Sequence, residues 1–458
     1  MPSTPAKTAS RALTVGILMG VFAVAFQAYA VATAMPRAAE DLGQLGLFAW
    51  TFSMFVIGIA LSTVLGGRAV DRFGPVIPSA LGLALFTVGL VVAGSAPTML
   101  VLVTGRFVQG LGGGLINVAL MVIVARAYAE HRRAVMMTAF SFCWVLPAFI
   151  GPPVAALVTR LWSWHAAFWI LVPVMVLTAI LCWRPMLAIQ RQGVPQHDEP
   201  VDPVPVWAAI AAALGLAVLQ AGTERLDLLG AGMAVAGLAA LGLAVPRMMP
   251  PGFFTVAAGI PAVSWTRLLQ AGSFFTFESF LPLALVQTRG LSLFWAGSML
   301  TIGSVGWTTG SWLQSRPWLR IRRDQIIVLG TLCGVVGLVG VAAGVLVPST
   351  AGLVVIATAY SIAGLGMGFS TASGSLAVMQ LSSHARLGRN TSSLQVSETM
   401  GNALSLGLAG AIFVALRETH IPTTTFAWLF AAICLVAVAA YLAARRIGPV
   451  RNATSGVG

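Results

Sequence analysis

Long apolar runs separated by short polar loops make up most of this chain of 458 residues. A bilayer core of about 30 Å requires about 20 apolar residues in a helix, and in lipid the backbone polar groups must bond within their own segment. We therefore interpret the runs as membrane-spanning helices. The predicted spans number fourteen and cover residues 12–35, 46–69, 77–96, 98–127, 135–159, 165–183, 205–222, 228–246, 262–287, 293–314, 325–347, 351–379, 391–416 and 423–444.

Composition supports a membrane protein. Hydrophobic residues make up 58% of the chain and charged residues 9%, whereas soluble domains carry about 45–50% and about 25%. These values exclude a soluble enzyme, a nucleic-acid-binding module and a disordered chain. The first apolar run is too long for the core of a signal peptide, so we expect it to be retained as a membrane anchor.

The net charge of +13 comes from basic residues that are concentrated in the loops. With the N-terminus inside, 20 of the 26 Lys and Arg residues fall on inside loops, tails and span ends, including Arg267 and Arg323, and five fall outside. Inside loops of membrane proteins carry this basic excess, which faces anionic lipid headgroups. We therefore predict a multi-pass protein of the cell membrane with both termini in the cytoplasm and no nucleic-acid partner.

The spans are grouped around a proline-rich, acidic stretch. Six predicted spans precede it, a short pair rich in Ala and Gly follows, and six more complete the chain. We expect an all-α membrane protein with an N-terminal six-helix bundle over 1–184, a cytoplasmic linker over 185–204, an inserted helix pair over 205–250 and a C-terminal six-helix bundle over 251–458.

Two segments repeat a glycine pattern at a distance of 254 residues. The stronger match aligns Gly110, Leu111, Gly112 and Gly114 with Gly364, Leu365, Gly366 and Gly368. A weaker match aligns Gly67 and Asp71 with Gly310 and Gln314. Two related halves are typical of transporters, whose substrate site lies near the membrane midplane where the halves meet.

The loop after the second span carries a glycine and charge motif made of Gly67, Asp71, Arg72 and Gly74. With the repeat and the helix count, this motif resembles the major facilitator superfamily, and within it the fourteen-helix drug:proton antiporter branch, over essentially the whole chain. The resemblance implies two six-helix bundles plus an inserted helix pair. It also implies a cytoplasmic gate at these four residues, with the aspartate at a helix N-terminus and the arginine pairing across the halves.

Three further motifs extend the resemblance. Arg106 matches an arginine of the fourth helix that the family uses in proton coupling. The fifth span carries part of an antiporter motif in Pro147, Gly151 and Pro152, which favours export over import. In the first span, Gln27 and Tyr29 align with a segment that contributes to substrate binding, and the family usually has an aspartate where Gln27 stands.

Two of the 13 acidic residues, Glu278 and Glu398, fall within predicted spans. A charge at the bilayer centre costs about 2.5–3.5 kcal/mol on insertion scales. A buried carboxyl group lowers this cost by binding a proton, as a proton carrier must. We predict Glu278 as the main proton-coupling residue and Glu398 as the second, with Arg106 assisting.

Aromatic side chains provide surfaces for lipophilic cations through cation–π contacts of about 0.5–2 kcal/mol each. The candidate substrate-binding residues are therefore Gln27, Tyr29, Trp144, Phe274, Phe277 and Trp307. Other chemistry lacks support, because there is no phosphate-binding loop, no catalytic triad and no metal-ligand spacing of the four cysteines. We expect no cofactor and no metal.

These observations predict a proton-coupled secondary active transporter, not an enzyme, that exports small amphipathic or lipophilic compounds. Its expected partners are protons, a small amphipathic substrate or drug, and membrane lipids, and the family implies a monomer. Three alternatives remain open: an exporter of lipid or glycolipid, a proton-coupled importer, and a non-transporting membrane receptor on the same scaffold.

Overall fold

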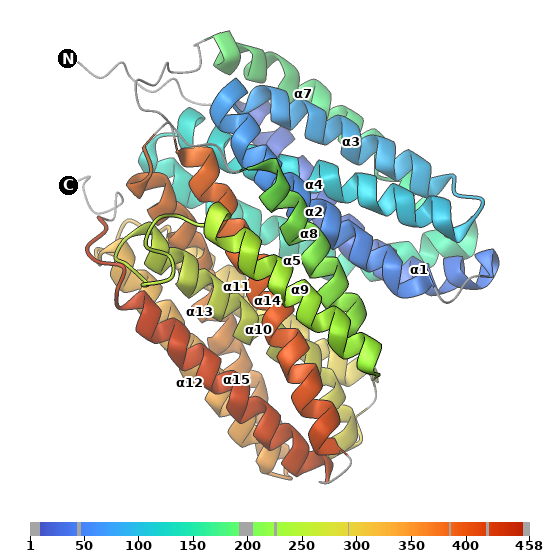
Figure 1. The fold of residues 1–458 in the computed structure, drawn as a ribbon, viewed down its shortest axis with the longest axis vertical. Helices are drawn as coiled ribbons and strands as arrows, with labels where there is room; N and C mark the ends of the chain where they lie inside the picture. The colour runs from blue at the N-terminus through green and yellow to red at the C-terminus, as the bar shows by residue number, and fades with distance from the viewer. Residues whose placement is uncertain are drawn as a thin grey trace. The chain divides into compact units, whose positions relative to one another are not determined.

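The computed structural model describes residues 10–43, 47–191, 205–223, 227–291, 293–383, 386–417 and 421–451. Within these ranges the chain is helical and contains no strand. The helices are α1 (Arg11–Leu42), α2 (Phe48–Phe73), α3 (Val76–Gly94), α4 (Met99–Ala127), α5 (Glu130–Leu161), α6 (Ala166–Trp169), α7 (Val172–Arg191), α8 (Val206–Thr223), α9 (Leu228–Met248), α10 (Ile260–Arg289), α11 (Leu293–Leu313), α12 (Arg323–Leu346), α13 (Thr350–Leu381), α14 (Leu387–Arg417) and α15 (Pro422–Ala444). Figure 1 labels all of them except the short α6.

The all-helical architecture agrees with the prediction, and each of the fourteen predicted spans overlaps a helix. Among the described residues, eleven helical segments are long and apolar enough to cross a membrane. The apolar stretch of α8, Val206–Leu219, is shorter than a full span. The number of fourteen crossing helices is therefore not confirmed.

Local sequence signals explain where several helices begin and end. The Ser10 hydroxyl accepts a hydrogen bond from the Leu13 amide at 3.2 Å, and Thr98 caps α4 in the same way through the Val101 amide. Hydroxyl side chains at this position satisfy amides that have no partner within the helix. At the other end, Gly43 and Gly290 close α1 and α10 in the left-handed conformation, which glycine adopts without steric cost.

The segment around the expected linker differs from the prediction. The sixth predicted span is divided into the short α6 and the longer α7. Helix α7 continues past Pro185 to Arg191, so the first part of the expected linker is helical. Residues 192–204 lie outside the described residues. The expected inserted pair forms α8 and α9, and a Cβ on Gly237 would lie 2.6 Å from the Gly215 carbonyl oxygen, a close approach typical of packed membrane helices.

The chain forms two compact units. The first unit contains residues 1–222, 227–248 and 382–392, and the second contains 223–226, 249–381 and 393–458. Helices α1 to α9 thus belong to the first unit apart from one residue at the end of α8, and α10 to α13 and α15 belong to the second. Helix α14 begins in the first unit and continues in the second.

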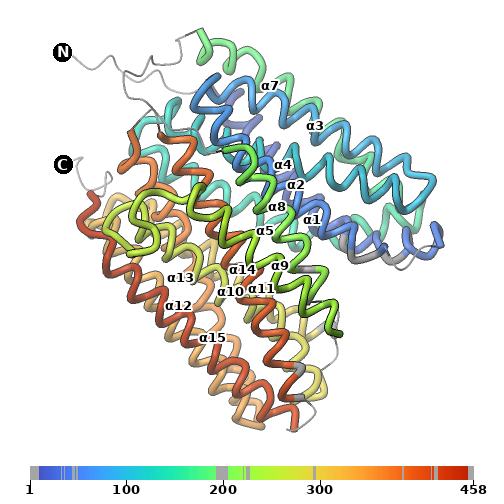
Figure 2. Tube along the Cα trace, in the orientation of Figure 1, coloured from blue at the N-terminus to red at the C-terminus, as the bar shows by residue number. Residues whose placement is uncertain are grey.

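Glycines pack α4 against α2 in the first unit, and the second unit repeats this packing between α13 and α11. Figure 2 labels these four helices along the Cα trace. A Cβ on Gly110 would meet the carbonyl oxygen of Phe55 in α2. A Cβ on Gly364 would meet the carbonyl oxygen of Gly303 in α11. At both sites a larger residue would meet the same obstacle, which is a backbone oxygen of the neighbouring helix.

The contact of α3 with α4 is repeated between α12 and α13. A Cβ on Gly82 would lie 3.0 Å from the Gly112 carbonyl oxygen, and a Cβ on Gly330 would lie 2.7 Å from that of Gly366. The second copy follows the first by 248 residues in α2 and α3 and by 254 residues in α4. The two units therefore contain the same three-helix packing.

The stronger sequence repeat, at 254 residues, is the register that relates the packing of α4 to the packing of α13. The weaker one is not: it pairs Gly67 with Gly310 and Asp71 with Gln314, five residues out of the 248-residue register of α2 and α11. Glycine is frequent in this chain, so a short glycine match at the end of a helix carries little information about register.

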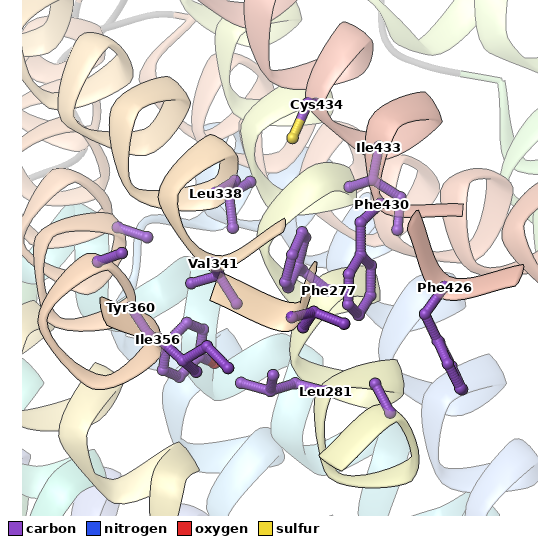
Figure 3. Close-up of a cluster of buried hydrophobic side chains, with 14 of the residues drawn as sticks. Phe277, Leu281, Leu338, Val341, Ile356, Tyr360, Phe426, Phe430, Ile433 and Cys434 are labelled. Carbon is purple, nitrogen blue, oxygen red and sulfur yellow. The ribbon is translucent and has the colours of Figure 1, made fainter. Parts of the chain in front are cut away.

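A hydrophobic cluster of the second unit involves α10, α12, α13 and α15, and Figure 3 draws its centre. Phe277 of α10 is fully buried and stacks on Phe430 of α15, with ring centroids 4.0 Å apart. Leu281, Leu338 and Val341 complete the packing around these rings. Burying aromatic rings of this size contributes much of the stability of a packed core.

Candidate functional site

A buried arginine lies at the centre of a hydrogen-bonded group in the first unit. The side chain of Arg106 in α4 is 2% exposed. Its guanidinium donates to the Gln109 side-chain oxygen at 2.8 Å and to the Thr51 carbonyl at 3.0 Å, and it lies 4.2 Å from the ring centroid of Phe55. Gln27 of α1, also fully buried, donates to the same Gln109 oxygen at 3.2 Å. The structure thus brings together Arg106 and Gln27, which the sequence singled out separately.

Neutral groups surround this cation. None of the ion pairs found among the described residues includes Arg106. Hydrogen bonds from a charged donor are about twice as strong as neutral ones, and stacking on an aromatic face adds to them. The first unit therefore holds a positive charge in its interior by hydrogen bonds and one aromatic ring.

Four aromatic side chains form a cluster in the second unit, which we call the aromatic cluster: Phe274, Phe275, Trp307 and Tyr360. Phe274 stacks on Tyr360 with centroids 5.6 Å apart and meets Trp307 edge-on at 5.8 Å. Trp307 also contacts Phe275 at 5.9 Å. Phe274 and Tyr360 are buried, whereas Phe275 and Trp307 are half-buried and present ring surface outside the core.

Glu278 lies one helical turn beyond the aromatic cluster on α10. Residues three and four positions apart share a helix face, so Phe275 and Phe274 lie on the same side of α10 as Glu278. Its side chain is half-buried. Within the described part of the chain, no hydrogen bond or ion pair is found for Glu278.

Glu398 of α14, by contrast, has a partner. Its carboxylate accepts a hydrogen bond from Arg267 of α10 at 2.8 Å. Arg267 also donates to the Thr371 carbonyl at 2.5 Å and to the Ser375 hydroxyl at 3.2 Å, both on α13. The structure therefore places the two predicted acids of the second unit in different environments.

The motif at the C-terminal end of α2 caps the first turn of α14. The Asp71 carboxylate accepts hydrogen bonds from the amides of Gly388 and Arg389 at 2.7 and 2.8 Å, and both contacts lie within the first unit. An anion at a helix N-terminus satisfies free amides and interacts favourably with the helix dipole. Gly67 allows this approach, because a Cβ there would lie 2.9 Å from the Gly388 carbonyl oxygen.

The other members of the motif have simpler roles. Gly74 ends α2 at a positive φ of 78°. The exposed Arg72 lies over the ring of Phe73, 5.1 Å from its centroid. Among the described residues, no ion pair of Arg72 is found.

Residues of the predicted antiporter motif lie on α5. Pro147 and Gly151 are buried, and Pro152 is half-buried. A Cβ on Gly151 would lie 3.1 Å from the Cβ of Tyr29, so the motif lets α5 pack closely against α1. Tyr29 itself is half-buried.

The remaining predicted aromatic residues separate into surface and core. Trp144 of α5 is 45% exposed. Phe277 lies entirely within the core described above (Figure 3), and it presents no surface to a ligand. A nearby cavity of about 10 Å³, lined by Gln270, Phe274, Thr331 and others, has room for about one water molecule and is too small for a drug.

Sequence reasoning missed several residues of these sites. We expected Arg267 and Arg323 at inside loops or span ends, but both are buried, and Arg323 donates to the Gln314 side-chain oxygen at 2.7 Å. Arg267 lies inside the predicted span 262–287, and its position there was the available signal. Tyr360 and Phe275 carried no signal, because aromatic residues are common in apolar runs.

No metal site appears among the described residues, since no group of three or more His, Cys, Asp or Glu side chains gathers there. The four cysteines are unpaired thiols.

Comparisons with known proteins identify the family of this chain. The family model of the Major Facilitator Superfamily matches residues 17–405. Multidrug resistance protein 3 of Bacillus subtilis is 32% identical over 175 residues, which cover 38% of this chain and 34% of that protein. The multidrug efflux pump SdrM of Staphylococcus aureus is 21% identical over 402 residues, covering 87% of this chain and 89% of the pump.

Solved structures share the fold. A bacterial homologue of the iron transporter ferroportin, in an outward-facing state, matches with a TM-score of 0.69 at 14% identity, covering 95% of this chain and 98% of that one. The proton:xylose symporter XylE matches with a TM-score of 0.65 at 12% identity, covering 94% of each chain. At these identities the likeness concerns the fold alone.

Proposed function

We propose that this chain, which belongs to the Major Facilitator Superfamily, exports small amphipathic or lipophilic compounds in exchange for protons. Family membership and the apolar helices make it a multi-pass membrane protein and a transporter, not an enzyme. Export is supported by the relatives that are named as multidrug efflux pumps and transporters. The basic inside loops support a cell-membrane location with both termini in the cytoplasm.

The observation that supports proton coupling is the position of Glu278 and its lack of an ion-pair partner among the described residues. Glu278 lies near the middle of α10. A carboxyl group away from water and cations is most stable with a proton bound, and it ionises when water reaches it. Such a group changes its charge as a transporter alternates between closed and hydrated states, which is what proton exchange requires.

The aromatic cluster supports a lipophilic cation as substrate. Phe275, one turn from Glu278 on α10, and Trp307, which contacts Phe275, present ring surface, and Phe274 and Tyr360 support them from the core. An aromatic face attracts a cation by about 0.5–2 kcal/mol, and a nearby carboxylate adds Coulombic attraction. In this proposal the proton and the cationic substrate compete for Glu278, so that binding of one favours release of the other.

In this proposal the contact of Asp71 with α14 acts as the cytoplasmic gate of the transporter. It consists of two hydrogen bonds from backbone amides in the first turn of α14 to the Asp71 carboxylate. We infer that they hold one closed state of the cycle.

The proposal is tested with purified protein in proteoliposomes, using ethidium as the probe. A pH gradient across the wild-type vesicle should drive ethidium accumulation. The substitution Glu278→Gln should lower this accumulation about tenfold or more, corresponding to at least about 1.4 kcal/mol of lost coupling, because the amide cannot exchange a proton.

Glu40→Gln is the matched control, since Glu40 is a surface acid, 65% exposed, in contact with Arg37. This variant should transport like the wild type. Undiminished accumulation by the Glu278→Gln protein would reject Glu278 as the coupling residue, and a wild-type protein that ignores the pH gradient would reject proton coupling itself.

A further inference from the structure

A small cavity lies among four helices of the second unit. Its volume is about 10 Å³, and α10, α12, α13 and α15 all contribute to its wall. Most of the wall is apolar and includes Leu338, which Figure 3 draws. Three polar side chains interrupt it, namely Gln270 and Ser273 of α10 and Thr331 of α12. Neither the family motifs nor the proposed roles of Glu278 and the aromatic cluster account for these three side chains.

The two hydroxyl groups of the cavity wall are deeply buried and present oxygen acceptors. Ser273 and Thr331 are each 1% exposed. The Ser273 hydroxyl donates to the Gln270 carbonyl at 3.0 Å, and the Thr331 hydroxyl donates to the Val328 carbonyl at 2.9 Å. A hydroxyl group has one proton and two lone pairs. Since both protons are used within the helices, each oxygen has lone pairs that accept a hydrogen bond from a donor in the cavity.

The third polar side chain, Gln270, is held in place by α13. It is 6% exposed, and its amide nitrogen donates to the Gly366 carbonyl at 3.4 Å. A side-chain amide has a second hydrogen on the nitrogen and two lone pairs on the oxygen. Gln270 therefore adds one further hydrogen-bonding group to the wall, and the cavity has polar partners on α10 and on α12.

The chemistry of the wall decides which ligand fits. Purely apolar cavities stay dry, whereas a polar cavity holds a water molecule if it offers about 10–15 Å³ and two to four polar partners. Hard metal cations take about six or more oxygen ligands and are usually held by carboxylates. Among the described residues, those that line this cavity carry no charge. The volume and the neutral acceptors therefore favour one water molecule over a cation.

We propose that this cavity is a binding site for one ordered water molecule, which links α10 to α12 and supports the aromatic cluster from behind. The water donates one hydrogen bond to the Ser273 oxygen and one to the Thr331 oxygen. A bridge of this kind is nearly as favourable in enthalpy as a direct hydrogen bond. It satisfies two buried hydroxyl groups that the apolar wall leaves with acceptor capacity.

Phe274 connects this water site to the aromatic cluster. Its ring lines the cavity, stacks on Tyr360 with centroids 5.6 Å apart and meets Trp307 edge-on at 5.8 Å. Protein interiors are close-packed, so a change in the cavity shifts the ring that borders it. This part of the inference rests on the proposed function, in which the aromatic cluster binds a lipophilic cation. The water then acts as a positioning element of the substrate site.

Gly334 of α12 provides a way to displace the water. It lines the cavity, and the nearest described atom to a Cβ at this position is the Gln270 amide nitrogen, at 3.9 Å. A small side chain therefore enters the cavity without a clash. The methyl group of Gly334→Ala takes the place of the water but offers no hydrogen bond. The hydroxyl group of Gly334→Ser takes the same place and donates to the acceptors of the wall.

The first experiment compares the thermal unfolding of these two variants, using the full chain purified in detergent. With water in the cavity, Gly334→Ser should have a Tm about 2 °C or more above that of Gly334→Ala. Alanine is the better helix former, so a dry cavity predicts the opposite order. The matched control is the pair Gly242→Ser and Gly242→Ala on α9. Gly242 is exposed, no described atom lies within 4 Å of a Cβ there, and alanine should be at least as stable as serine.

A second variant, Thr331→Val, removes one acceptor of the water while nearly keeping the shape of the side chain. It should lower the Tm of the wild type, because the water loses a partner. Combined with Gly334→Ala, which has already displaced the water, Thr331→Val should have little further effect. Two residues that share a partner show this kind of coupling, whereas a dry cavity predicts the same effect of Thr331→Val in both backgrounds.

The link to the aromatic cluster is measured by the binding of ethidium to the purified protein, without a pH gradient. Gly334→Ala should raise the Kd about threefold or more, because Phe274 loses its support. Gly334→Ser should keep the Kd within about twofold of the wild type, because its hydroxyl group replaces the water. The two Gly242 variants should bind ethidium like the wild type.

Each outcome decides the question. A Tm of Gly334→Ala equal to or above that of Gly334→Ser, or additive effects of Gly334→Ala and Thr331→Val, would overturn the water site. If neither Gly334 variant folds, Thr331→Val decides alone, and a Tm at or above the wild-type value overturns the site. The expected Tm order with an unchanged Kd of Gly334→Ala would reject the link to the aromatic cluster. A wild-type protein that does not bind ethidium would reject the proposed substrate class, and the unfolding measurements would still decide the water site.

Discussion

Arg106 and Tyr360 occupy the same position in the two units. The shift of 254 residues that aligns Gly110 with Gly364 also aligns these two residues. In the first unit this position carries a cation held by the Gln109 side chain, the Thr51 carbonyl and an aromatic ring. In the second unit it carries the buried ring of the aromatic cluster. One backbone packing thus supports two different chemistries.

The difference has a physical reason. Backbone oxygens of neighbouring helices allow only glycine at Gly110 and Gly364, so these positions tolerate little change. The side chain one turn earlier is not restricted in this way. Both copies could therefore diverge there, the first toward a buried cation and the second toward an aromatic ring, without altering how the helices pack.

The largest effect is expected from Arg106→Gln in the first copy. The substitution removes two hydrogen bonds from a charged donor, each worth about 1.5–3 kcal/mol, and the contact with the Phe55 ring. We expect a marked fall in thermal stability in detergent and a fall of about tenfold or more in ethidium transport.

Arg160→Gln is the matched control, because Arg160 is an exposed arginine near the end of α5. It should leave both measurements unchanged. A folded Arg106→Gln protein with normal transport would show that the first copy does not need its cation, and the comparison of the two copies would lose its functional meaning.

A smaller and equal effect in both copies is expected from Gly110→Ala and Gly364→Ala. Each added methyl group meets a backbone oxygen of the neighbouring helix, and overpacking of this kind costs about 1–3 kcal/mol. Thermal unfolding of the purified variants measures the loss.

Gly232→Ala on α9 is the control, since its Cβ would have no neighbour within 4 Å. Alanine in place of an unconstrained helical glycine should stabilise by about 0.5–1 kcal/mol. Clearly unequal losses at Gly110 and Gly364 would mean that the two copies no longer share their packing.

Much of the fold could be predicted from hydropathy alone. Each predicted span overlaps a helix, because a long apolar run in lipid has no other way to satisfy its backbone. Boundaries were less predictable: α1 continues past Pro36 to Leu42, and α7 passes Pro185. Proline restricts a helix locally but does not end it when neighbouring helices supply the packing.

The site was harder to predict. A membrane helix is apolar on all sides, so its pattern does not say which face is buried. Phe275 and Phe277 are two positions apart and equally apolar, yet Phe277 lies in the core and Phe275 is half-buried beside Trp307. Polar residues were better guides, since Arg106, Glu278 and Glu398 are costly in lipid and each stood out in the sequence.

The smallest effect is expected from Tyr360→Phe, the matching change in the second copy. The ring that stacks on Phe274 remains, and at most one hydrogen bond of the hydroxyl is lost, a cost of about 1 kcal/mol or less. Ethidium transport should stay within about twofold of the wild type. Both the loss of stability and the change in transport are much smaller than those expected for Arg106→Gln at the equivalent position.

Tyr441→Phe on α15 serves as the control for loss of a tyrosine hydroxyl outside the aromatic cluster. If Tyr360→Phe reduces transport as strongly as Arg106→Gln does, and Tyr441→Phe does not, the second copy also depends on a polar group at this position. The hydroxyl would then be the counterpart of the guanidinium, and the two copies would differ in charge but not in their use of a polar side chain at this point of the helix.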